Sequence, residues 1–320
     1  MDGVLNLTQY FEITNDKTNK DIPYPYMDRK AAMEYYTDMW GVFNSKIIEP
    51  VIEKFEDKYI LRADLAPGGL KAYGGERIIA ETKKNRLVYC APRQGHAPDA
   101  IAMLAKIYDK NVTFFSPASN KASNHQSSLY AYDHVEMRFI KIAAMPVLNS
   151  YAKKWADDNN SKYLPFGLSG VPMVTAGLIN MAKNITKIIG HEPTQLYCAV
   201  STGTMIRALQ IGWPNVEAYG VAVARNIHSG EIGDATVISA NMPFLMEDPI
   251  AKTMPFPSTA AYDAKAWGLF IKNGKPGSIF INVGSDEHIN RNIGTVNIGK
   301  INSSRNWHDM QDMYECRMYK

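Results

Sequence analysis

The 320-residue sequence predicts an α/β protein with two lobes. Two segments, 86–116 and 195–209, each run from an apolar strand through a loop of small or polar residues into a helix, which is typical of α/β folds. The chain also exceeds the length of about 250–300 residues at which one hydrophobic core stops growing. We therefore expect two α/β lobes, with candidate functional residues on the loops that follow the strands.

The segment 195–209 contains the clearest candidate for a phosphate site. Residues 195–201 form a continuous apolar run that predicts a buried strand, and residues 205–209 begin a helix. The joining loop is Ser201-Thr202-Gly203-Thr204, which supplies three hydroxyl groups and one glycine. Free backbone N–H groups and the dipole at a helix start bind phosphate, although an ordinary Ser/Thr-capped helix has the same pattern. No lysine follows Gly203, which argues against a nucleoside triphosphate loop.

The segment 86–116 predicts one strand–helix–strand unit. The expected strands are 86–91 and 111–116, and an alanine-rich amphipathic helix covers 97–107. The loop 92–96 lies at the carboxyl end of the first strand, where open α/β sheets bind ligands. This loop is therefore a second candidate for ligand binding.

Lys71 is a candidate nucleophile because glycine pairs lie on both sides of it. A buried lysine amine has a lowered pKa and forms a Schiff base with an aldehyde, and glycines allow a flat ring to approach closely. The same glycines are also typical of a turn that carries a solvated lysine, and the pattern alone leaves both interpretations open.

The rest of the chain continues the alternation of helices and strands. Residues 1–32 are polar and read as an arm, and residues 235–266 carry four prolines and predict an irregular loop. The remaining expected elements are helices at 31–43, 149–158 and 172–189, strands at 135–142 and 216–224, and a helix-bearing crossover at 119–133.

Composition excludes several classes of protein. No apolar run approaches the roughly 20 residues of a membrane helix, and the first residues lack the pattern of a secretory leader, so we expect no membrane partner and a cytoplasmic location. Cys90, Cys198 and Cys316 are too few and scattered for a disulfide framework or a thiolate metal site. The seven histidines lack metal-ligand spacing, so no metal site is expected.

Charge gives little support for nucleic-acid binding. The formal net charge is only +3, and the basic run Lys83-Lys84-Asn85-Arg86 is typical of a solvated turn before a strand. No zinc finger, helix-turn-helix or RNA-recognition signature is present, although the sequence does not exclude a nucleic-acid contact.

Six short segments, in the same order along the chain, resemble the fold-type II (tryptophan synthase β-like) pyridoxal-phosphate enzymes. Within that family they are most similar to the aminocyclopropane-carboxylate deaminase and D-cysteine desulfhydrase group. The matching segments are Gly68-Gly69-Leu70-Lys71, Gln94-Gly95-His96-Ala97, residues 163–170, Cys198 to Thr204, Tyr262-Asp263-Ala264-Lys265-Ala266, and Phe280 to Ser285. The matches extend from about Tyr59 to Ser285.

The resemblance implies a two-lobed, three-layer α/β/α architecture and pyridoxal 5'-phosphate as the cofactor. Residues 1–75 and 165–320 would form a large cofactor-binding lobe, and residues 76–164 a small mobile lobe. A homodimer and a small amino-acid-type substrate are also implied.

The resemblance also implies roles for individual residues. Lys71 would hold the cofactor and move the α-proton, with Tyr73 and Tyr262 as further catalytic candidates. The loop 201–204 would bind the cofactor phosphate. His96 would replace the family's asparagine beside the ring oxygen, and Ser285 would face the pyridine nitrogen, with Glu287 as an alternative. The expected substrate-binding residues are Gln94, Gly95, His96 and Ser169.

Two departures from the family pattern bear on the reaction. Gly95 stands where the family has a serine that handles protons, and Val283 stands where it has a threonine. The first departure puts cyclopropane ring opening in doubt. The resemblance favours elimination or deamination of an amino acid. Alternatives are decarboxylation or β-replacement, including reaction of an amino acid attached to a larger molecule, and a noncatalytic binder of a phosphate ligand.

Overall fold

The computed structural model describes residues 28–118, 123–140, 144–223, 227 and 231–295. Most of the predicted arm, together with Cys316, lies outside these ranges. The chain forms two compact units: the first comprises the chain up to Ala63 and Gly167–Val283, and the second comprises Asp64–Phe166 and the chain from Gly284. These boundaries place Lys71 and Ser285 in the second unit, whereas the predicted large lobe contains both. Which part moves during function stays a prediction.

The first unit is built on a six-stranded sheet with the order β1-β2-β10-β7-β8-β9. Its strands are β1 (Ile52–Phe55), β2 (Lys58–Arg62), β7 (Gln195–Val200), β8 (Glu217–Ala222), β9 (Thr236–Ser239) and β10 (Ile279–Asn282). Only the β1–β2 pair is antiparallel, and the other pairs are parallel. All six residues of β7 are buried, as expected for a strand covered on both faces.

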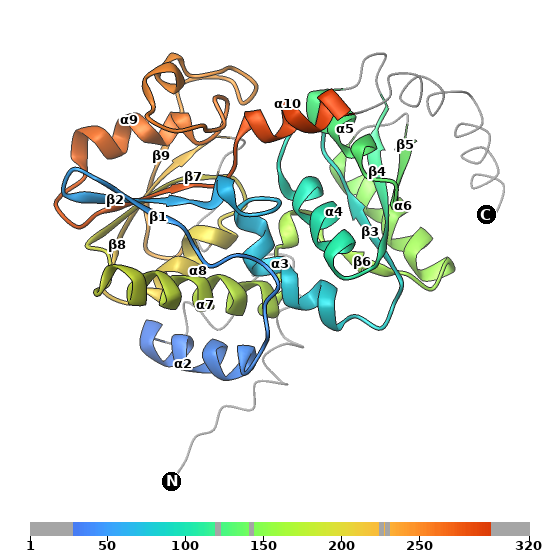
Figure 1. Cartoon of the computed structure of the whole chain (residues 1–320), viewed down its shortest axis with the longest axis horizontal. Helices are drawn as coiled ribbons and strands as arrows, with labels where there is room; N and C mark the ends of the chain where they lie inside the picture. The colour runs from blue at the N-terminus through green and yellow to red at the C-terminus, as the bar shows by residue number, and fades with distance from the viewer. Residues whose placement is uncertain (1–27, 119–122, 141–143, 224–226, 228–230, 296–320) are drawn as a thin grey trace, which may run out of the picture. The chain divides into compact units, whose positions relative to one another are not determined.

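Helices cover both faces of this sheet (Figure 1). They are α2 (Arg29–Trp40), α7 (Pro172–Ile189), α8 (Thr204–Gly212) and α9 (Ala264–Asn273). Helices α7 and α8 pack together on one face, with α2 outside them, and α9 packs on β7 from the other face. Helix α7 begins at a proline, whose missing N–H is not needed there, and ends at Gly190 with φ of 86°.

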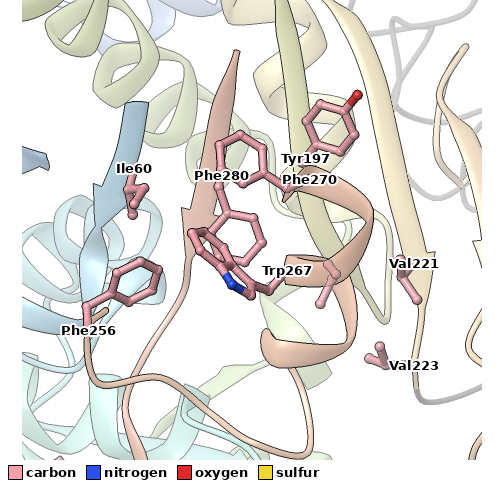
Figure 2. Close-up of a cluster of buried hydrophobic side chains, with 10 residues drawn as sticks. Ile60, Tyr197, Val221, Val223, Phe256, Trp267, Phe270 and Phe280 are labelled. Carbon is pink, nitrogen blue, oxygen red and sulfur yellow. The ribbon is translucent and has the colours of Figure 1, made fainter. Parts of the chain in front are cut away.

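An aromatic cluster holds α9 against the sheet (Figure 2). Trp267 and Phe270 of α9 contact Phe280 of β10, with ring centroids 5.1 and 5.4 Å apart, and Phe256 packs on Trp267 from the preceding loop. The contacts of Trp267 with Phe280 and with Phe256 are edge-on, and such contacts stabilise a core beyond the area they bury. The cluster fixes the position at which α9 begins, two residues after the candidate site residue Tyr262.

The second unit contains a four-stranded parallel sheet with the order β5-β4-β3-β6. Its strands are β3 (Arg86–Cys90), β4 (Asn111–Pro117), β5 (Val135–Ile140) and β6 (Lys162–Leu164). Its helices are α3 (Leu70–Glu81), α4 (Ala97–Ile107), α5 (Asn124–Ser128), α6 (Met145–Asp158) and α10 (Asp286–Thr295). Helix α6 packs on β3, β4 and β6, whereas α4 packs on α3 and β4.

The expected fold class and most expected elements are confirmed. The strand–helix–strand unit is β3–α4–β4, and α4 and α7 have the predicted bounds. The expected crossover at 119–133 contains only the short α5 and a 3₁₀ turn, Leu129–Ala131. The segment 235–266 is mostly irregular apart from β9, a 3₁₀ turn at Pro249–Thr253, and the first residues of α9. Among the described residues, no helix has the length and apolar character needed to cross a membrane.

Candidate active site

The candidate site residues are distributed over both units. The first unit carries Ser169, Ser201, Thr202, Gly203, Thr204 and Tyr262. The second unit carries Lys71, Tyr73, Gln94, Gly95, His96 and Ser285.

Lys71 is the second residue of α3 and does not lie in a solvated turn. Gly68 and Gly69 precede the helix with φ of 78° and 71°, values that favour glycine. A Cβ at Gly68 would lie 2.3 Å from Cα of Ala100, so the start of α3 makes a close backbone contact with α4. Burial lowers the pKa of the Lys71 amine to about 8. The amine therefore has a substantial neutral, nucleophilic fraction near physiological pH.

Tyr73 follows Lys71 by two residues on α3, and its hydroxyl oxygen is buried. Residues two apart on an α-helix do not share a face. The helix therefore directs these two side chains to different sides of α3.

The loop that carries Gln94 and Gly95 leads from β3 into α4, and His96 is the residue that caps α4. Gly95 has φ of 131°, which favours glycine. The Ser123 hydroxyl donates a hydrogen bond to the Arg93 carbonyl and ties the loop to the start of α5. The loop is thus anchored at the carboxyl end of the sheet, as predicted for a ligand-binding segment.

His96 lies in a crowded environment within the second unit. Burial, together with the neighbouring His125, lowers its pKa to about 3, so its imidazole is neutral at pH 7. The two imidazole centroids are 5.1 Å apart in an edge-on arrangement. A Cβ at Gly284 would lie 3.0 Å from Cγ of His96, so the chain after β10 passes directly against the ring.

The loop between β7 and α8 is shaped by Gly203, the capping residue of α8, which has φ of 74°. A Cβ at Gly203 would lie 1.9 Å from the carbonyl oxygen of Glu231, so only glycine fits. The hydroxyl oxygens of Thr202 and Thr204 are 3.2 Å apart. The first turn of α8 therefore offers backbone N–H groups beside clustered hydroxyls, which is the donor set that a phosphate needs.

The predicted substrate-binding residue Ser169 follows by two residues Gly167, which contacts Thr202 of the loop between β7 and α8. Gly167 has φ of 68°, and a Cβ there would lie 3.1 Å from Cγ2 of Thr202. Leu168 also has a positive φ, 56°, so the chain turns sharply beside the loop. This turn brings the segment 167–169 to the same part of the first unit as the phosphate candidate.

Arg207, on α8, was not expected from the sequence. Its side chain is buried, and burial lowers its pKa to about 10, which leaves the guanidinium protonated at neutral pH. The negative charge of Glu231 partly opposes this shift. An arginine one turn into an amphipathic helix gives no sequence signal of burial, because most such arginines are exposed.

Asp263 is a second residue that sequence reasoning missed as a site residue. It is fully buried immediately before α9, and its Oδ2 accepts a 3.0 Å hydrogen bond from the backbone N–H of Val283. Its charge, added to burial, raises the pKa values of Tyr262 and Cys198. The available signal was an aspartate at a helix start within the segment that resembles the family.

Ser285 and Glu287 lie at the start of α10. Ser285 is buried, and its Oγ accepts a 3.1 Å hydrogen bond from the backbone N–H of Glu287. This contact caps α10 and fixes the hydroxyl at the end of the segment that follows β10. Glu287 itself is exposed.

Comparison with solved structures identifies the fold. An aminocyclopropane-carboxylate (ACC) deaminase homologue matches with a TM-score of 0.64 and 14% identity, covering 84% of this chain and 100% of that chain. Diaminopropionate ammonia lyase from Escherichia coli matches with a TM-score of 0.59 and 13% identity, covering 88% and 94%. A pyridoxal 5'-phosphate-dependent aspartate racemase matches with a TM-score of 0.59 and 14% identity, covering 83% and 97%.

No protein-family profile matches the chain, and no curated protein matches it by sequence. The structural similarity spans nearly the whole length of the matched chains at low sequence identity. The chain therefore has the fold-type II architecture, and the expected fold is confirmed.

Proposed function

We propose that the protein is a pyridoxal-phosphate-dependent enzyme that eliminates or deaminates an amino acid. The observation that carries this proposal is Lys71, whose amine has a pKa of about 8. Lys71 lies at the beginning of α3, three residues after Gly68, which packs closely against Ala100 of α4. The names of two structural neighbours, a deaminase homologue and an ammonia lyase, support the reaction class. A third neighbour is named as dependent on the same cofactor.

The donors in the first unit fit the phosphate of this cofactor. Ser201, Thr202 and Thr204 supply hydroxyl groups, and the first turn of α8 supplies N–H groups. Gly203 keeps this turn free of a side chain, because a Cβ there would overlap Glu231. The buried guanidinium of Arg207 adds positive charge to the same helix.

Three residues are suited to form hydrogen bonds with polar atoms at the edge of the cofactor ring. The buried carboxylate of Asp263 is suited to a protonated pyridine nitrogen, and the Ser285 hydroxyl is a neutral alternative. The neutral imidazole of His96 has an N–H that can donate to the ring oxygen. When bound, the cofactor withdraws electrons from the α-carbon of an attached amino acid.

Lys71 is suited to move the α-proton. A pKa near neutrality lets an amine both accept and release a proton. Gly95 has no side chain for this task. Tyr262 has a raised pKa and stays protonated at neutral pH, so its hydroxyl can donate a proton or a hydrogen bond. Tyr73, with its buried hydroxyl, is the other candidate donor.

The loop with Gln94, Gly95 and His96 and the segment with Ser169 are suited to hold the substrate carboxylate. The first lies at the carboxyl end of β3, and Ser169 follows Gly167 and Leu168, which have positive φ. The substrate class that we propose is a small amino acid, and we propose a homodimer as the assembly.

Turnover assays test the reaction. Protein loaded with pyridoxal phosphate would be incubated with a panel of amino acids, and 2-oxo acid, ammonia, sulfide and carbon dioxide would be measured. We expect release of ammonia with a 2-oxo acid from at least one amino acid, and none from Lys71→Ala. Carbon dioxide without ammonia would indicate decarboxylation. Retained ligand affinity in Lys71→Ala, with no turnover by the unmodified protein, would indicate a noncatalytic binder.

A further inference from the structure

Two histidines that are far apart in sequence meet an aspartate in the second unit. His96 caps α4, His125 lies on α5, and Asp286 is the first residue of α10. One donor atom from each side chain lies within 4.8 Å of the other two. Helix α10 packs on α5, and the chain at Gly284 passes against the His96 ring, so packing of the unit brings the three elements together.

One donor atom in this cluster lacks a partner. The Nδ1 of His125 is buried and has no hydrogen-bond partner among the described residues. An unsatisfied buried polar atom costs about 1–3 kcal/mol, so its persistence calls for a ligand. The backbone at Gly95 also hydrogen bonds to this imidazole, which is the kind of contact that orients metal-binding histidines.

Asp99 and His288 lie near the cluster and act electrostatically on the His96 ring in opposite directions. An imidazole nitrogen with a free lone pair is a good ligand for a divalent transition-metal ion, and the cluster holds two imidazoles beside one carboxylate. The carboxylate of Asp99 is buried nearby and acts electrostatically on both rings. Asp99 is held in place by Tyr132, Asn292 and His288, at 2.8, 3.1 and 2.7 Å.

We propose that His96, His125 and Asp286 form a binding site for a divalent transition-metal ion. Two imidazoles and one carboxylate are a common donor set for Zn²⁺ and Fe²⁺, and three protein ligands leave a position open for water or a ligand. Tetrahedral ligands at about 2.0–2.1 Å from Zn²⁺ lie about 3.4 Å apart. Small side-chain rotations would close the observed spacing to this value.

The metal site does not depend on the proposed enzymatic function. Its donors include neither Lys71 nor the loop 201–204. His96 can serve both roles, because an imidazole that binds a metal through one nitrogen donates a hydrogen bond through the other.

Titration of tag-free, metal-free, full-length protein with Zn²⁺ tests the proposal by calorimetry, and Co²⁺ absorbance reports the ligand geometry. The Lys71→Ala variant, which lacks the proposed anchor for pyridoxal phosphate, is titrated alongside. This variant shows whether Zn²⁺ binds without any contribution from bound cofactor. We expect one equivalent of Zn²⁺ per chain in both proteins, with tetrahedral or five-coordinate Co²⁺ bands.

Matched variants locate the ion. Asp286→Asn and His125→Ala should each weaken Zn²⁺ binding by about tenfold or more. The control variants Glu287→Gln, at the next residue along α10, and His191→Ala, in the first unit, should bind Zn²⁺ as the unmodified protein does. Circular dichroism checks that each variant is folded. Asp286→Asn preserves the shape of the side chain, so it still tests the proposal if His125→Ala does not fold. Absence of stoichiometric Zn²⁺ binding, or equal binding by Asp286→Asn and Glu287→Gln, would overturn the proposal.

Discussion

The backbone N–H of Val283 donates a 3.0 Å hydrogen bond to Oδ2 of Asp263, a carboxylate with no exposed surface. This contact joins the first residue after β10 to the residue before α9, within the first unit. The threonine hydroxyl of the resembling family is absent at Val283, but the backbone at this position orients a stronger hydrogen-bond acceptor. A charged partner for the pyridine nitrogen therefore comes from Asp263 in our proposal.

Asp263→Asn should lower turnover while preserving the fold. The amide oxygen can still accept from Val283, but the negative charge is lost. Loss of one charged hydrogen bond of about 1.5–3 kcal/mol corresponds to about a 10- to 150-fold decrease in kcat. Steady-state kinetics with the substrate found in the panel would measure this decrease. Glu287→Gln is the control, and a larger loss in that variant would assign the nitrogen partner to Glu287 instead.

Thr202→Val should weaken binding of pyridoxal phosphate without affecting binding of pyridoxal. The substitution keeps the side-chain shape and removes the hydroxyl that lies 3.2 Å from that of Thr204. A hydrogen bond to a charged phosphate contributes about 1.5–3 kcal/mol, so the Kd should rise by about 10- to 150-fold. Equilibrium titration with both ligands would measure the difference. Equal weakening of both ligands would argue against a phosphate contact at this loop.

Capture of an aldehyde by Lys71 should depend on pH. The amine reacts only when neutral, and its pKa is lowered to about 8 by burial. The rate should therefore increase as the pH rises through about 8 and level off about one pH unit above it, where deprotonation is nearly complete. Stopped-flow absorbance with excess pyridoxal phosphate would measure the profile. A rate that continues to rise up to pH 10 would indicate an ordinary solvated lysine.

Gly68→Ala should destabilise the protein more than Gly190→Ala. Both glycines have positive φ, 78° and 86°, which costs about 1–2 kcal/mol for alanine. Only at Gly68 would the new Cβ also overlap another backbone atom, Cα of Ala100, and this overlap costs about 1–3 kcal/mol more. Chemical denaturation would compare the free energies of unfolding. Equal losses would show that α3 does not need the close contact with α4.

Local sequence patterns predicted the helices and strands whose signals are local. Helices α4 and α7 have the expected bounds because their apolar periodicity and proline starts are contained within each segment. The glycines around Lys71 left a turn open, but Gly74 and Gly75 are buried inside α3, which packs on α4. Close packing between two helices determines the structure there, and the sequence does not display it.

In the candidate site too, residues with a local sequence signal could be predicted, whereas residues that depend on tertiary packing could not. The glycine and hydroxyl loop at 201–204 follows a buried strand and was recognisable from its neighbours in the chain. Asp263 was not, because its burial depends on contact with the strand end at Val283. The dispersed histidines argued against a metal site, whereas folding brings His96 and His125 together from segments with no shared motif.

Borohydride reduction of the protein with pyridoxal phosphate, followed by peptide mapping, tests the central claim most directly. Reduction converts a Schiff base into a stable amine, so mass spectrometry identifies the lysine that carried the cofactor. We expect one modified site, at Lys71, with loss of the visible absorbance band on reduction and no stoichiometric adduct in Lys71→Ala. Stoichiometric modification of another lysine, or no adduct with excess cofactor, would contradict the assignment of Lys71 as the cofactor anchor.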